Sequence, residues 1–144
     1  MPDLFFERHI PHLPERVFEL VADLETYPRF VPLVSRMEVR SGAGPDERLA
    51  TMTLKFGPVT QSYTSRVTLD RKARTIAAKA VDGPFAYLDS LWRFEPEGQG
   101  TRVRFDIDFR ISNRLLAAAA EPAFAAKQQE IIEAFAEEAD RRFG

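Results

Sequence analysis

The segment from Asn113 to Phe143 constrains the fold most, because no other stretch of the chain is long and periodic enough to predict a major helix. One face of this predicted helix is apolar. The opposite face carries acidic and basic side chains four residues apart, a spacing that favours an exposed helical surface. A helix with one apolar face must bury that face, so we expect the rest of the chain to fold over it. The apolar side chains that recur at helical spacing are Phe124, Ile131, Phe135, Ala139 and Phe143.

Pro122 interrupts this segment. Proline lacks the backbone donor that a helix interior needs, and it disfavours helical geometry at the preceding residue, Glu121. The sequence therefore predicts a kink or a restart of the helix at Pro122, after a short helical piece that Ser112 or Asn113 caps.

The chain begins with a predicted strand and a predicted short helix. Apolar side chains alternate from about Leu4 to Ile10, which is typical of a half-buried strand. Pro14 then opens a short helix, which Tyr27-Pro28 is expected to end. Residues 29–32 are expected to form a turn, or one more helical turn, before the next strand starts near Val34.

From Val34 onward the hydrophobic pattern repeats every two residues. Turns are predicted at 41–46, 57–58, 70–73, 82–84 and 96–100. Strands joined by short turns are usually antiparallel neighbours, so about six of them form a meander that must curl over the long helix. This predicts an α+β fold. The side chains expected to face inward are Met52, Leu54, Phe56, Val59, Gln61, Tyr63, Ser65, Val67, Leu69, Ile76, Ala78, Ala80, Leu88, Ser90, Trp92, Phe94, Val103, Phe105, Ile107, Phe109 and Ile111.

Composition narrows the classes of function. A chain of 144 residues with 44% hydrophobic content fits one domain spanning residues 1–144. The formal charge of −2 argues against binding DNA or a strongly anionic surface. Without cysteine there is no disulfide, thiolate or cysteine zinc site. No apolar run reaches the ~18 residues of a membrane span and no signal peptide is recognised, so we expect a cytoplasmic protein.

The sequence shows no pattern of residues that is typical of a catalytic or metal-binding site. His9 and His12 are expected on opposite faces at the end of a strand, so no metal site is predicted. No nucleophile elbow or phosphate loop is recognised, and no catalytic residue is assigned. Two interpretations of the inward polar groups stay open: ordinary core polarity, or polar contacts at one end of an apolar pocket. These groups are Arg8, Gln61, Tyr63, Ser65 and Ser90.

Several motifs carry a family resemblance: Val17–Asp23 followed by Tyr27–Pro32, then Asp82–Leu88 with Trp92–Phe94, and Val103–Phe109. In this order the chain resembles the coenzyme Q-binding, START-like family of the polyketide cyclase/dehydrase and lipid transport superfamily. The resemblance implies a helix-grip fold, in which a curved antiparallel sheet wraps a long C-terminal helix. It also implies a carrier or chaperone of ubiquinone that supports quinone synthesis and respiratory electron transfer, rather than an enzyme.

The expected ligand is ubiquinone or a related polyprenyl lipid, with no other cofactor. Burial of each CH2-sized group contributes roughly 0.8 kcal/mol, so a cavity rich in phenylalanine suffices to hold an isoprenoid tail. Tyr63, Ser65 or Ser90 are candidates to contact the headgroup. The residues predicted to bind the ligand are Phe56, Tyr63, Phe85, Leu88, Trp92, Phe105, Phe109, Leu116, Phe124, Ile131 and Phe135.

A carrier of this kind needs an opening that meets the membrane surface. Two apolar stretches outside the strands qualify, one at Phe30, Val31 and Leu33 and the other at Leu115 next to Leu116. We therefore expect transient contact with the inner membrane face.

Two other functions stay open. Bacterial members of the resembled family include ribosome association toxins that block the joining of ribosomal subunits. The low sequence pI near 5.8 argues against an RNA-rich partner. A polyketide cyclase or dehydrase is the third hypothesis, and the lack of an acid and base pair argues against it.

Overall fold

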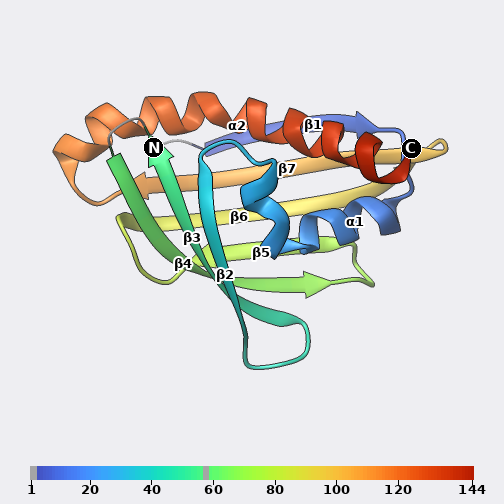
Figure 1. Ribbon diagram of the computed structural model, residues 1–144, viewed down its shortest axis with the longest axis horizontal. Coiled ribbons are helices and arrows are strands. Elements are labelled where there is room, and N and C mark those ends of the chain that lie inside the picture. Colours follow the sequence, from blue (N-terminus) through green and yellow to red (C-terminus); the bar gives the residue numbers. More distant parts are fainter. Residues whose placement is uncertain (1–2, 57–58) are drawn as a thin grey trace.

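The computed structural model describes residues 3–56 and 59–144 (Figure 1). In chain order its elements are β1 (Asp3–Ile10), α1 (Pro14–Ala22), the 3₁₀ helix η1 (Leu24–Arg29), β2 (Val34–Ser41), β3 (Glu47–Phe56), β4 (Val59–Asp70), β5 (Thr75–Ala80), β6 (Phe85–Glu97), β7 (Gly100–Ile111) and α2 (Arg114–Phe143). Among the described residues, no helix is both long and apolar enough to cross a bilayer.

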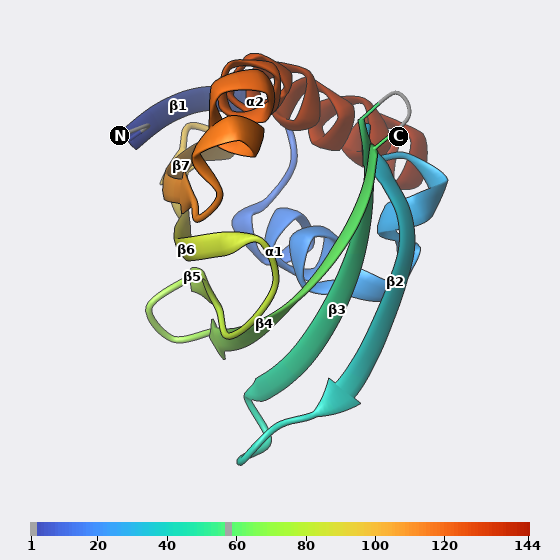
Figure 2. The ribbon, with the colours of Figure 1, turned by 90° about the vertical axis from the view of Figure 1, so that its left-hand side faces the viewer.

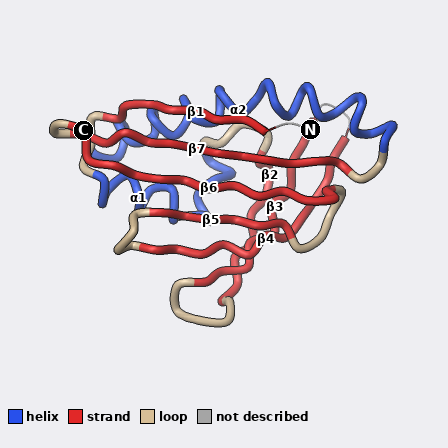
Figure 3. Tube along the Cα trace, turned by 180° about the vertical axis from the view of Figure 1, so that it is seen from behind, coloured by secondary structure: helices blue, strands red, loops and turns tan. Residues whose placement is uncertain are grey.

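The strands form one seven-stranded antiparallel sheet in the order β1-β7-β6-β5-β4-β3-β2 (Figure 3). The predicted meander from β2 to β7 is confirmed, and β1 joins it by pairing with β7, the last strand in sequence. Figure 2 shows the sheet curving from β7 through β4 to β2, with α2 lying across its open side. The α+β helix-grip fold is therefore confirmed.

The alternating pattern placed the inner face of the sheet correctly. In β7, Val103, Phe105, Ile107 and Phe109 are buried. The apolar stripe of α2 faces them, with Phe124, Phe135 and Ala139 at most 5% exposed. The core therefore lies between the concave side of the sheet and α2.

The first helix is shorter than predicted. α1 ends at Ala22, and the chain turns at Asp23 into the separate 3₁₀ helix η1, which contains Tyr27 and Pro28. The prediction that one helix runs to Tyr27-Pro28 is wrong. A 3₁₀ helix has 3.0 residues per turn, so Leu24 and Tyr27 project to the same side, and both are buried.

The predicted restart at Pro122 is also wrong, because α2 runs unbroken from Arg114 to Phe143. Proline removes one intrahelical bond, while packing against the sheet holds the residues on either side in helical geometry. The first turn is capped by Asn113, whose Oδ1 accepts hydrogen bonds from the backbone N–H groups of Leu115 and Leu116 at 2.9 and 3.0 Å.

The turn predicted at residues 96–100 is narrower, because β6 continues to Glu97 and includes Pro96. Pairing between β5 and β6 stops at Arg93, and the N–H of Phe94 already reaches past β5 to the carbonyl of Arg74. The nitrogen of Pro96 lies two residues further along the same edge, where it has no strand to bond, so proline is tolerated there.

Side-chain bonds tie the C-terminal half of α2 to the N-terminal part of the chain. His12 Nε2 lies 2.9 Å from Asp140 Oδ1, and Arg142 Nη1 lies 3.1 Å from Asp23 Oδ2. Such surface pairs contribute little to stability individually. They connect this end of the helix to the chain on both sides of α1.

Candidate functional site

A cavity of about 120 Å³ lies between the inner face of the sheet and α2, and η1 and the start of β2 close one side. Its lining is mostly apolar and comes from elements far apart in the sequence. The lining residues are Leu24, Tyr27, Val31, Leu33, Val34, Met37, Ala50, Met52, Leu54, Tyr63, Ser65, Val67, Ile76, Ala78, Leu88, Ser90, Trp92, Phe105, Ile107, Phe124, Gln128, Ile131 and Phe135.

The cavity exists because small side chains meet on neighbouring strands. Ala50 of β3 pairs with Ser65 of β4, and Ala78 of β5 pairs with Ser90 of β6. All four line the cavity. Such short side chains cannot reach α2, whereas the larger residues around them can, so space remains over the middle of the sheet.

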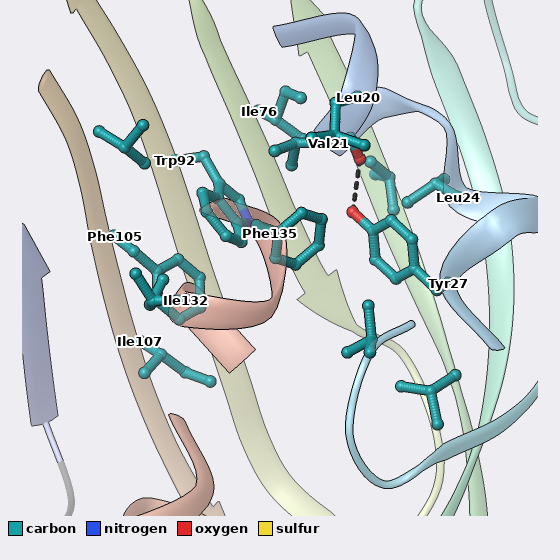
Figure 4. Packing of buried hydrophobic residues seen from close by; sticks show 14 of the residues in the cluster. Leu20, Val21, Leu24, Tyr27, Ile76, Trp92, Phe105, Ile107, Ile132 and Phe135 are labelled. Carbon is teal, nitrogen blue, oxygen red and sulfur yellow. Dashed lines mark hydrogen bonds between the residues drawn. The ribbon is translucent and has the colours of Figure 1, made fainter. Parts of the chain in front are cut away.

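Aromatic rings form the wall around this space (Figure 4). The ring of Phe135, on α2, packs 5.1 Å from that of Trp92 on β6 and 5.2 Å from that of Tyr27 on η1. Trp92 in turn packs 4.4 Å from Phe105 on β7. Phe135 therefore joins the helix, the sheet and η1 at one point, and such ring pairs favour a fixed geometry.

The two buried tyrosines are both neutral at physiological pH. Tyr27 donates its hydroxyl hydrogen bond to the carbonyl of Val21, as the dashed line in Figure 4 shows. Burial, and secondarily the charge of Asp23, raises the pKa of Tyr27. Burial raises the pKa of Tyr63 to about 12. Within the described residues its hydroxyl donates to one weak acceptor, Met52 Sδ at 3.5 Å.

Three further polar side chains line the cavity: Ser65, Ser90 and Gln128. Ser65 is 7% exposed and Gln128 is 2% exposed. Gln128 Nε2 donates to the carbonyl oxygen of Phe124 at 3.0 Å. Among the described residues, the hydroxyls of Ser65 and Ser90 have no hydrogen-bond partner, and none of the lining side chains is charged. Such a site suits an uncharged, largely apolar ligand with a few polar atoms.

Most of the predicted ligand-binding residues surround this cavity. Two predicted entrance residues, Val31 and Leu33, also line it, and Leu33 has a positive φ of 74°. The predicted ligand-binding residues that line it are Tyr63, Leu88, Trp92, Phe105, Phe124, Ile131 and Phe135.

Phe85 and Leu116 lie elsewhere, around a second cavity of about 20 Å³ beneath the N-terminal half of α2. Leu54, Tyr63 and Phe124 line both cavities and so separate them. The smaller space therefore extends the larger one toward the start of α2.

Three other predicted site residues, Phe30, Phe109 and Leu115, line neither cavity. Phe109 is fully buried, with its ring 4.7 Å from that of Phe124. Phe30 packs edge-to-face against Phe135, with ring centres 5.2 Å apart. Leu115 is 86% exposed. The side chain of Phe56 lies outside the described part of the structure.

Most of the polar side chains predicted to face inward are also distributed between the two cavities. Tyr63, Ser65 and Ser90 line the main cavity and Gln61 lines the small one. Arg8 does not enter either, because its guanidinium bonds Glu133 of α2 at 3.0 Å.

The two histidines are separated, as the sequence indicated. His9 Nδ1 lies 2.6 Å from Glu97, whereas His12 bonds Asp140. Within residues 3–56 and 59–144 no cluster of three metal-binding side chains is found.

Sequence reasoning missed Gln128 and Tyr27. Gln128 follows Phe124 by four residues and precedes Ile131 by three, so it lies on the apolar stripe of α2, and its helical position was a sufficient signal. Tyr27 was hidden by the prediction that it ends a helix.

Comparison with known proteins agrees with this architecture. Residues 10–136 match the family described as polyketide cyclase / dehydrase and lipid transport. The chain is 30% identical to the ribosome association toxin RatA of Rickettsia prowazekii, over 88% of each chain. It is 27% identical to the mitochondrial coenzyme Q-binding protein coq10 of Schizosaccharomyces pombe, over 92% of this chain and 83% of that protein.

Solved structures show the same fold. TTHA0849 from Thermus thermophilus matches 99% of this chain and 100% of its own with a TM-score of 0.86 at 22% identity. The Zhui aromatase/cyclase from Streptomyces matches 99% of this chain and 96% of its own with a TM-score of 0.75 at 19% identity. A START superfamily protein from Mycobacterium smegmatis matches 96% of this chain and 97% of its own with a TM-score of 0.77 at 13% identity. At these identities the likeness concerns the fold alone.

Proposed function

The chain belongs to the polyketide cyclase / dehydrase and lipid transport family, and from this premise we propose that it binds ubiquinone or a similar polyprenyl lipid and carries it in the cavity beneath α2. The observation that carries the proposal is the lining: aromatic and aliphatic side chains, five side chains with a hydroxyl or amide group that can form hydrogen bonds, and no charge. A similar protein of Schizosaccharomyces pombe is named for binding coenzyme Q.

The cavity volume decides which part of the ligand it holds first. An apolar cavity of about 150 Å³ admits benzene. The 120 Å³ here is smaller than that, so the substituted ring of ubiquinone can enter only if side chains of the cavity wall shift, and a polyprenyl tail needs more space again. Rotation of Tyr63 or Phe124, which separate the two cavities, would join them and give the tail a path beneath the start of α2.

This path leads to the apolar start of α2. Leu116 lines the small cavity and Leu115 projects into solvent beside it. An exposed leucine at the end of an apolar channel is suited to transient contact with a bilayer, from which a quinone would enter. We propose that the protein is cytoplasmic and meets the inner membrane face at this point.

We further propose that the bound molecule leaves chemically unchanged. Acid–base catalysis needs a titrating group within hydrogen-bond reach of the substrate. The lining offers only hydroxyls and one amide, and burial raises the pKa of Tyr63 away from the neutral range. A cyclase or dehydrase mechanism finds no acid and base pair in these residues.

The test is organic extraction of the protein purified from its own cells, followed by mass spectrometry. A stoichiometric quinone or polyprenyl lipid is expected. A preparation with no bound lipid that also fails to take up short-chain ubiquinone would refute the proposal.

Ribosome binding is a second candidate, because a relative named as a ribosome association toxin covers 88% of the chain. Sedimentation of ribosomes in a sucrose gradient with added protein tests it. Separation of 70S particles into subunits at stoichiometric protein would support this function, and an unchanged profile would oppose it.

A further inference from the structure

Gln128 is the most deeply buried polar side chain of the cavity, at 2% exposure on the inner face of α2. A position on the apolar stripe of a helix normally holds an apolar residue, because a buried amide must find partners for both its N–H and its C=O groups. Its neighbours on the stripe, Phe124, Ile131 and Phe135, follow that rule. Gln128 therefore requires a specific explanation.

The hydrogen bond of Gln128 sets which way its amide points. Nε2 donates to the carbonyl oxygen of Phe124, one turn earlier in the helix, at 3.0 Å. A carbonyl oxygen only accepts, so the opposite orientation would place Oε1 against another acceptor. Within the described residues Oε1 accepts no hydrogen bond. The cavity thus contains one oriented acceptor that lacks a donor.

The other polar groups of the cavity do not impose a direction. The hydroxyls of Ser65, Ser90 and Tyr63 rotate, and each can donate or accept. A quinone carbonyl only accepts, and a hydroquinone hydroxyl can donate. Of these two ligand forms, only the hydroquinone can donate a hydrogen bond to Gln128 Oε1.

We propose that Gln128 Oε1 accepts a hydrogen bond from a ring hydroxyl of the ligand, so that the cavity prefers a hydroquinone to the corresponding quinone. This inference rests on the proposed function and adds the oxidation state of the ring. One neutral hydrogen bond changes affinity by about threefold to tenfold, so the quinol should bind about threefold to tenfold more tightly.

The chain supplies its own probe, since Trp92 is its single tryptophan and lines the cavity. Fluorescence titrations would use ubiquinone with one isoprene unit and its quinol, both under anaerobic conditions, with Kd taken from the midpoint. Gln128→Met keeps the length of the side chain and removes the acceptor. The matched control is Gln129→Met, the same change at the next residue, which is exposed.

The wild-type protein and Gln129→Met are expected to prefer the quinol, and Gln128→Met is expected to bind both forms with equal affinity. Equal affinity in the wild-type protein, or an undiminished preference in Gln128→Met, overturns the inference and leaves the carrier function standing. Binding of neither form defeats the carrier function itself. If Gln128→Met does not fold, the wild-type ratio of the two affinities alone decides.

Discussion

Replacing Ala78 with Val adds two methyl groups to the floor of the cavity, where Ala78 of β5 lies between Val67 and Ser90 on the neighbouring strands. The added groups enter space that is now empty, so they gain contacts without displacing packed atoms. At roughly 0.8 kcal/mol per buried CH2-sized group, the upper limit of the gain is about 1.6 kcal/mol. Val also favours a strand.

Stability and ligand binding should therefore change in opposite directions. For a chain of this size, a gain of about 1 kcal/mol raises the melting temperature by roughly 2–4 °C. At the same time the 120 Å³ cavity loses a substantial part of its volume, so short-chain ubiquinone should bind at least about fivefold more weakly, since overpacking costs about 1–3 kcal/mol.

Thermal unfolding followed by circular dichroism and titration of Trp92 fluorescence measure the two effects. Ala77→Val is the matched control, because Ala77 is the preceding residue of β5 and its side chain points to the outer face. The control keeps the strand preference of Val and leaves the cavity intact. A lower melting temperature for Ala78→Val, or ligand binding as tight as that of the control, would refute the claim that this space is available.

Three further predictions follow from the same geometry. Phe135→Ala should lower the free energy of unfolding by about 3–5 kcal/mol, because this ring joins three walls of the core. Glu137→Ala, at an exposed position, should change it by less than about 0.5 kcal/mol. Equal denaturation midpoints for the two variants would contradict this prediction. Leu115→Glu should leave the melting temperature unchanged and abolish binding to vesicles in flotation assays, since this side chain is 86% exposed, and undiminished binding would place the entrance elsewhere. Burial raises the pKa of Tyr63 from 10.0 to about 12, so its contribution to stability is complete below pH 10 and is lost as the pH rises toward 12. In Tyr63→Phe the unfolding midpoint should therefore decline less steeply with pH over this range than in the wild-type protein. Parallel declines in the two proteins would count against this prediction.

The fold was predictable from local pattern because each strand and the long helix repeat their apolar side chains at their own period. The alternation in β7 assigned both faces correctly, and the spacing of Phe124 and Phe135 assigned the inner face of α2. The pairing of β1 with β7 was not predictable in this way, since it joins residues about one hundred positions apart.

The site was less predictable for a physical reason. A cavity depends on which small residues become neighbours, and Ala50, Ser65, Ala78 and Ser90 meet only through the register of four strands. Large aromatic residues identify a core, but the short side chains beside them decide where that core is hollow.

The unequal attachment of α2 has a mechanical consequence. Its C-terminal end is bonded through Asp140 and Arg142 to the chain around α1, while its N-terminal half is held by the cap at Asn113 and by Glu121, whose Oε2 accepts a hydrogen bond from the N–H of Ile111 at 2.8 Å. A rod that is held by more bonds at one end bends more easily toward the other end. Amide hydrogen exchange should therefore be slower around Ala139 than around Leu116.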